Sequence, residues 1–331
     1  MLSSSSLPAT AGTIHSLYGH TMGTSWSVKL VAPARTDSHA LHAGIQVQLD
    51  DVVAQMSTWE PDSDITRFNQ ATAGTWHTLP EQFWEVLSCA LEMARASGGA
   101  YDPTVGPLVA AWGFGAGSAA RSVPDDAVLS AAQARVGWRR LATGDGRCLL
   151  QPGGLQLDFS AIAKGYGVDC VARFLRGRGI TSALIEVGGE LHGYGRKPDG
   201  EPWRVLVESS PDEEAESVVP RVIDLDNLAI ATSGDRWHRF EQSGQRYSHT
   251  LDPRTGLPVA HAPAAVTVIA ADAMRADAWA TALTVMGADD GFSFAEQQNL
   301  AARFLIRGDE SLQERMTSRF EAHLSTNARS A

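Results

Sequence analysis

The chain has 331 residues and a formal net charge of −11, so it is long enough for one large core or two lobes. The acidic excess, with no cluster of Lys and Arg to offset it, argues against nucleic acid as a ligand. No run reaches the roughly 20 apolar residues of a membrane-spanning helix, and Cys89, Cys148 and Cys170 lack the spacing of a zinc site or a disulfide framework.

The N-terminal residues 1–20 are rich in Ser and Ala, and we expect them to be mobile. They contain no basic start, no continuous apolar stretch and no Cys, so no signal peptide is visible. We therefore expect a cytoplasmic protein, or a periplasmic or membrane-anchored one if a leader has been removed. We expect residues 21–308 to form the folded domain and the polar segment 309–331 to fray.

Hydrophobic periodicity and turn residues predict alternating strands and helices along the domain. We expect strands at residues 25–31, 182–187, 203–208, 221–230 and 266–270, and helices at 38–56, 81–97, 160–178, around 277 and at 292–298. Long helices mixed with hairpin-like strands favour the α+β class, with mixed or antiparallel sheets flanked by helices.

The segment 153–166 has the pattern of an anion-binding helix start. An apolar strand with Leu155 and Leu157 is expected to lead into Asp158, a capping Ser160 and a helix with Lys164 in its first turn. A helix N-terminus offers unpaired N–H groups and a partial positive charge, and Lys164 adds a full charge. An ordinary capped helix is the alternative interpretation.

Two further segments contain polar groups that could bind a metal ion or act as a base. On a helix, Asp277 and Thr281 are four residues apart and share a face, where their oxygens suit Mg²⁺ or Ca²⁺. The alternative is a Thr bonded to its own helix and a solvent-facing Asp. His249 precedes the turn sequence Asp-Pro-Arg-Thr-Gly at 252–256, and is either a base or a structural residue.

Together these segments make the chain similar to the ApbE family of flavin transferases (FAD:protein FMN transferases). The matching blocks, in the family's order, are residues 22–24, 56–69, 99–109 with 112–115, 157–166, 186–190, 231–235, 247–256 and 276–283. The resemblance therefore extends from about Met22 to Gly287. It implies an ApbE-like fold in which FAD is held between two halves.

The resemblance also implies which residues bind the substrate and the metal. The positions that match FAD contacts are Met22, Trp59, Ala100, Tyr101, Asp102, Asp158, Lys164 and Leu251. Family members usually have Tyr where this chain has Trp59; an indole keeps a flat face for stacking but loses the phenol hydroxyl. The implied Mg²⁺ ligands are the carbonyl of Ala161 and the side chains of Asp277 and Thr281.

The activity that the resemblance implies is Mg²⁺-dependent transfer of FMN from FAD to a Ser or Thr hydroxyl of an acceptor protein, with release of AMP. His249 matches the family's histidine and is the candidate base. This chain lacks a complete acceptor motif, so the acceptor is expected to be another protein, such as a respiratory or redox flavoprotein subunit. The alternatives are a Mg²⁺-dependent FAD diphosphatase that gives FMN and AMP, and a non-catalytic FAD-binding protein.

Overall fold

The structure, a computed structural model, describes residues 12–117, 121–207, 219–234, 239–242, 244–259, 263–308 and 311–325. Residues 1–11 of the N-terminal segment, Asp235 of the 231–235 block and residues 326–331 lie outside these ranges. No helix in the described ranges combines the length and apolar character needed to span a membrane.

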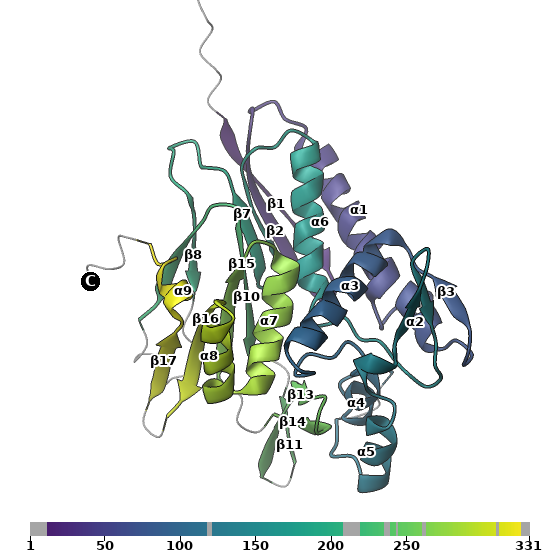
Figure 1. Cartoon of the computed structure of the whole chain (residues 1–331). Helices are drawn as coiled ribbons and strands as arrows, with labels where there is room; N and C mark the ends of the chain where they lie inside the picture. The colour runs from purple at the N-terminus through teal and green to yellow at the C-terminus, as the bar shows by residue number, and fades with distance from the viewer. Residues whose placement is uncertain are drawn as a thin grey trace, which may run out of the picture.

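The centre of the molecule is an eight-stranded sheet with the order β1-β2-β6-β7-β10-β15-β16-β17 (Figure 1). All pairings in it are antiparallel, which confirms the α+β expectation. The strands are β1 (Thr13–Thr21), β2 (Thr24–Ala32), β6 (Ala183–Val187), β7 (Glu190–Tyr194), β10 (Leu228–Gly234), β15 (Ala265–Ala270), β16 (Ala301–Arg307) and β17 (Leu312–Met316).

Helices cover one face of this sheet (Figure 1). They are α1 (Ser38–Met56), α3 (Glu81–Ala96), α6 (Ala163–Gly177), α7 (Ala273–Met286) and α8 (Ala288–Gln297). The buried side chains of α1 and α6 pack on β2 and β6 in one cluster, whereas α3 and α7 share a second cluster with β15 and β16. Met22 touches both clusters, at the point where the two parts of the core meet.

The opposite face is covered by the hairpin of β8 (Trp203–Val207) and β9 (Arg221–Leu225) together with α9 (Ser318–Glu321). The single strand expected at 221–230 is wrong: β9 pairs with β8, and β10 pairs with β7 and β15. The two strands are separated by a turn in which Asn227 has a φ of 56°, a conformation that a continuous strand cannot accommodate.

The expected boundaries of the folded domain are also wrong at both ends. Residues 13–20 are not a loose tail but most of β1, which pairs with β2 along its whole length and buries Leu17. Within 309–331, β17 extends the sheet and Phe320 of α9 is fully buried. β1 and β17 are the two edge strands of the sheet, and most of their side chains are exposed or only partly buried.

The remaining elements are short. They are α2 (Asp64–Asn69), β3 (Trp76–Thr78), α4 (Gly106–Ala111), α5 (Asp126–Gln133), a 3₁₀ turn at Trp138–Arg140, β4 (Ala142–Gly144), β5 (Cys148–Leu150), β11 (Arg239–Gln242), β12 (Gln245–Ser248), β13 (Leu251–Asp252) and β14 (Leu257–Pro258). Figure 1 shows α4, α5, β11, β13 and β14 gathered at the lower end of the molecule, beyond the main sheet.

Helices α6 and α7 approach each other closely and cap each other. Asp169 of α6 accepts hydrogen bonds from the N–H groups of Ala273 and Met274, at 3.0 and 2.9 Å, at the start of α7. Asp277 of α7 accepts one from the N–H of Gly165, at 3.1 Å, in the first turn of α6. This contact requires glycine, because a Cβ on Gly165 would lie 2.2 Å from the carbonyl oxygen of Ala273.

This packing gives a stability prediction. Gly165→Ala should lower the free energy of unfolding by about 1–3 kcal/mol, the usual cost of overpacking a core, because backbone and not a flexible side chain blocks the new methyl group. Gly177→Ala is the matched control: it lies in the same helix, and a Cβ there meets nothing within 4 Å. Urea unfolding of both variants measures the difference; equal stabilities would contradict the tight contact.

Candidate active site

Two hairpin tips lie against each other at one end of the sheet. Met22 and Gly23 join β1 to β2 with φ values of 48° and 70°, and Gly188 and Gly189 join β6 to β7 with φ values of 59° and 102°. Two-residue loops with positive φ match the twist of the strands that they connect. The N–H of Gly188 donates to the carbonyl of Ser25 at 3.0 Å, which ties the two tips together.

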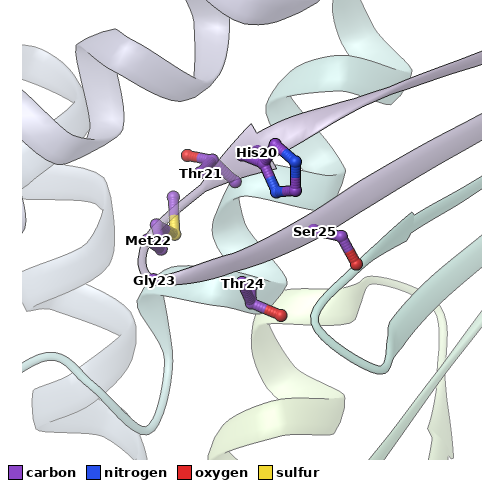
Figure 2. A pocket seen from close by; sticks show the side chains of 6 residues that line it. All are labelled: His20, Thr21, Met22, Gly23, Thr24 and Ser25. Carbon is purple, nitrogen blue, oxygen red and sulfur yellow. The ribbon is translucent and has the colours of Figure 1, made fainter.

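Met22 lies at the edge of a hollow of about 520 Å³ on the β1–β2 tip. Figure 2 shows Met22 at the turn and the side chains of Thr24 and Ser25 on the strand that follows it. A Cβ on Gly167 of α6 would lie 3.2 Å from the Met22 Cε, so the thioether packs against that helix. The structure therefore places Met22 between the hollow and α6, a position open to a ligand.

The start of α6 differs in detail from the expectation. Leu155 and Leu157 are buried but form no strand; instead, the N–H and carbonyl of Leu157 bond to the side chain of Asn69. Ser160 is not the cap, because its N–H and hydroxyl both donate to Asp158 Oδ1, at 2.8 and 2.6 Å. The helix begins at Ala163, with Ile162 as an N-cap that offers no side-chain acceptor.

Asp277 supplies the acceptor that α6 lacks in its own sequence. Its side chain is only 5% exposed, so the alternative of a solvent-facing Asp is wrong. Burial raises the pKa of this carboxyl, while the charge of Lys164 and the Gly165 N–H act in the opposite direction. A carboxylate is favourable here because it faces the positive end of the α6 dipole.

The three groups expected to bind the metal lie on the elements that meet at this point. Ala161 is half-buried just before α6, and Thr281 is half-buried one turn beyond Asp277 on α7. In the described part of the chain there is no cluster of three His, Cys, Asp or Glu side chains. A cation here would depend on one carboxylate with hydroxyl and carbonyl oxygens, a donor set that fits Mg²⁺ better than softer metals.

Lys164 is held by a second carboxylate. Its Nζ donates to Glu190 Oε1 at 2.5 Å, and Glu190 is only 3% exposed. Burial lowers the pKa of Lys164, but the charges of Asp277 and Glu190 outweigh it and raise the pKa above its ordinary value. Burial raises the pKa of Glu190 to about 8, against the opposing effect of Lys164. The Lys164 side chain is 31% exposed, so it is accessible to an anion in solution.

The loop that follows α3 lies beside this cluster. Tyr101 is buried, its hydroxyl has no hydrogen-bond partner among the described residues, and burial followed by the nearby carboxylate of Asp277 raises its pKa. Asp102 accepts from Thr104 with Oδ1 and from the Trp138 N–H with Oδ2. Asp102 therefore shapes the loop, whereas the Tyr101 hydroxyl is free to bond a ligand. Ala100, which directly precedes Tyr101, is also buried.

His249 directly follows β12 and comes two residues before β13. It is half-buried, with its ring edge-on to Phe114 at a centroid distance of 6.4 Å. Leu251 packs with Leu108 and Trp112 of the α4 region. The predicted turn at 252–256 is confirmed, because it joins β13 to β14.

Of the positions expected to contact FAD, Trp59 is the most exposed. The Trp59 side chain, just after α1, is 69% exposed, which leaves a flat aromatic face open to solvent. Glu190, by contrast, was not singled out from the sequence as a site residue. The available signal was the pair Gly188-Gly189 before it, because a two-residue turn fixes where the next side chain points.

The raised pKa of Glu190 gives a prediction about pH. Between the ordinary pKa of 4.5 and the folded value of about 8, the folded protein binds a proton that the unfolded chain has lost. This contribution to stability should therefore decline as the pH rises from about 5 to about 8.5. Glu190→Gln, which cannot titrate, should show a smaller decline in the free energy of unfolding. Urea unfolding of the parent and of Glu190→Gln, each at about pH 5 and about pH 8.5, measures the two declines in the free energy of unfolding. Identical declines would count against the raised pKa of Glu190.

Comparison with known proteins identifies the family of the chain. Residues 22–304 match the model of the ApbE family. The FAD:protein FMN transferase of Vibrio cholerae is 39% identical over 93% of this chain and 92% of its own length, and that of Klebsiella pneumoniae is 36% identical over 96% and 91%.

Solved structures give the same result. The apo form of the Pseudomonas stutzeri flavinyl transferase ApbE matches with a TM-score of 0.88 at 38% identity, covering 94% of this chain and 97% of that one. The flavin transferase ApbE from Vibrio cholerae matches with a TM-score of 0.87 at 37% identity, covering 95% and 100%. The chain therefore belongs to the ApbE family and is an enzyme, a transferase.

Proposed function

We propose that this protein transfers FMN from FAD to a Ser or Thr hydroxyl of an acceptor protein, with Mg²⁺, and releases AMP. The observation that carries the proposal is the start of α6, where the positive end of the helix, the Lys164 ammonium and the buried Asp277 carboxylate meet. A diphosphate with its cation needs this combination of positive groups and a hard oxygen ligand. The relatives named FAD:protein FMN transferase support the choice of flavin.

In this proposal the FAD extends along the elements around α6. Lys164, Asp158 and Met22 lie at or near the start of that helix, and Tyr101 offers a hydroxyl without a partner. The remaining contacts in the proposal are Ala100, Asp102, Leu251 and the exposed ring of Trp59, onto which a flavin or adenine ring could stack.

The metal would be held by Asp277, Thr281 and the carbonyl of Ala161. When bound, Mg²⁺ neutralises charge on the diphosphate and makes AMP a better leaving group. Lys164 would add a second positive group at the same place. It would stabilise the negative charge that develops when the phosphate–oxygen bond to AMP breaks.

His249 would act on the other reactant. The acceptor hydroxyl oxygen attacks the phosphorus of the FMN half, the bond from that phosphorus to the AMP phosphate oxygen breaks, and His249 takes the hydroxyl proton. A hydroxyl is a weak nucleophile at neutral pH, so a base beside it contributes to the rate. If water took the place of the hydroxyl, the same residues would release FMN and AMP.

The decisive experiment is mass spectrometry of a candidate acceptor subunit after incubation with FAD, Mg²⁺ and this protein. Transfer adds the mass of one FMN to the acceptor and releases one AMP per modified acceptor. AMP formed at the same rate without any acceptor would instead identify a diphosphatase. FAD that stays intact with Mg²⁺ and acceptor present would identify a flavin-binding protein without catalysis.

The role of His249 can be tested separately from binding. His249→Ala should bind FAD nearly normally but transfer FMN about 10²–10⁴-fold more slowly, the usual effect of losing a general base. His39→Ala, at an exposed position on α1, is the control and should keep the parental rate. Stopped-time transfer assays and FAD titrations give both quantities; joint loss of binding and transfer would make His249 a contact or structural residue.

The metal site requires variants that separate charge from capping. Asp277→Asn keeps an oxygen that can accept from the Gly165 N–H but loses the negative charge, so the fold should persist while Mg²⁺ affinity and turnover collapse. Thr281→Ala should have a milder effect, since a neutral hydroxyl contributes less to a hard cation.

A chelator should abolish turnover in the unmodified protein, and added Mg²⁺ should restore it. Asp289→Ala, whose side chain is 95% exposed, is the control for a lost carboxylate and should behave like the parent. Parental turnover by Asp277→Asn, at the Mg²⁺ concentration that just saturates the parent, would rule out this metal site.

A further inference from the structure

Glu190 is a buried carboxylate beside the candidate active site to which the proposed reaction assigns no role. It closes the β6–β7 hairpin opposite Val187, directly after the Gly188-Gly189 turn. Its Oε1 accepts from Lys164 Nζ, and its Oε2 is buried and has no partner among the described residues. A buried charged group without full hydrogen bonding costs free energy, so its position calls for an explanation.

The tip of the β6–β7 hairpin also packs against the stem of the Lys164 side chain. A Cβ on Gly188 would lie 2.8 Å from Thr24 Cγ2 and 3.3 Å from Lys164 Cδ. The Lys164 stem therefore lies against the β6–β7 tip, close to where Thr24 also packs, and its ammonium ends on Glu190. A lysine has four rotatable side-chain bonds, and this arrangement removes most of that freedom.

Among the residues that the structure describes, two charged groups act on Lys164 from the elements packed around it, Asp277 from α7 and Glu190 from β7. Asp277 is committed to the Gly165 N–H and, in the proposed function, to the metal. Of the two, Glu190 is the one to which the ammonium donates a hydrogen bond in the described part of the chain. The direction of Lys164 at the start of α6 thus depends on Glu190.

We infer that Glu190 is a positioning residue, which holds the Lys164 ammonium directed at the diphosphate of the substrate. The inference rests on the proposed function for the identity of that substrate. Glu190 itself does not contact the reacting atoms: it acts through Lys164. Its unpartnered Oε2 leaves one acceptor for a water or a ligand donor when the site fills.

A first experiment reads the lysine directly, without any assay of activity. The folded protein is treated with acetic anhydride at pH 9–10, above the pKa of about 8 of Glu190 so that its carboxylate is charged. Acetylation of Lys164 is followed by peptide mass spectrometry, with exposed Lys29 as the internal reference. Without Glu190, burial is opposed by Asp277 alone, so the Lys164 pKa should fall. Each unit of fall gives about a tenfold increase in free amine, and we expect at least about tenfold faster acetylation in Glu190→Ala.

Two further variants define the interaction. Glu190→Gln keeps an oxygen that accepts from Lys164 but loses the charge, so acetylation should be intermediate. Glu186→Ala is the matched control, because Glu186 lies on the neighbouring strand and accepts from the hydroxyl of Ser27, away from Lys164. Its Lys164 should react at the parental rate. If Glu190→Ala does not fold, the Lys164 acetylation rate of Glu190→Gln is compared with that of the parent instead.

A second experiment measures transfer. Glu190→Ala should lower kcat about 10- to 100-fold, the range for residues that orient a ligand-binding group, and Glu190→Gln should recover part of it. Parental Lys164 acetylation in folded Glu190→Ala would overturn the inference, as would parental kcat with saturating FAD. If the parent transfers no FMN at all, the proposed function fails, whereas the acetylation rates still decide whether Glu190 holds Lys164.

Discussion

The reciprocal capping of α6 and α7 is the contact on which the rest of the site depends. Each helix presents its first N–H groups to a carboxylate of the other, Asp169 in one direction and Asp277 in the other. A helix start without a local cap is weakly determined, and Ile162 cannot supply one. The position of Lys164 in space therefore depends on a residue more than a hundred positions away in the chain.

The sequence allowed much of the fold to be predicted where local signals are strong. The helix at 38–56 and the strand at 266–270 are found within a residue of the expected bounds, because periodic apolar residues mark them clearly. The strand expected around Leu157 failed because its backbone bonds go to the side chain of Asn69, a partner 88 residues away. Local patterns contain no information about such a partner.

The same distinction applies to the site. Lys164 and Asp277 could be singled out because each lies in a recognisable block, and the resemblance to a family put them in one site. Glu190 also lies in a matching block, 186–190, but its role could not be identified from the sequence, because that role comes from its contact of 2.5 Å with Lys164, which exists only in the folded chain. Ser160 was misassigned for the converse reason: a hydroxyl suited to capping bonds instead to its neighbour Asp158.

The β1–β2 turn has an energetic consequence. Met22 adopts a left-handed backbone conformation, with a φ of 48°, which costs a residue with a side chain roughly 1 kcal/mol more than glycine. The chain nevertheless places a long thioether there, packed beside Gly167 and bordering the hollow of the tip. The strained turn thus makes the hairpin less stable than a glycine would. In return, Met22 provides an adaptable, polarisable surface beside the hollow, which glycine could not provide.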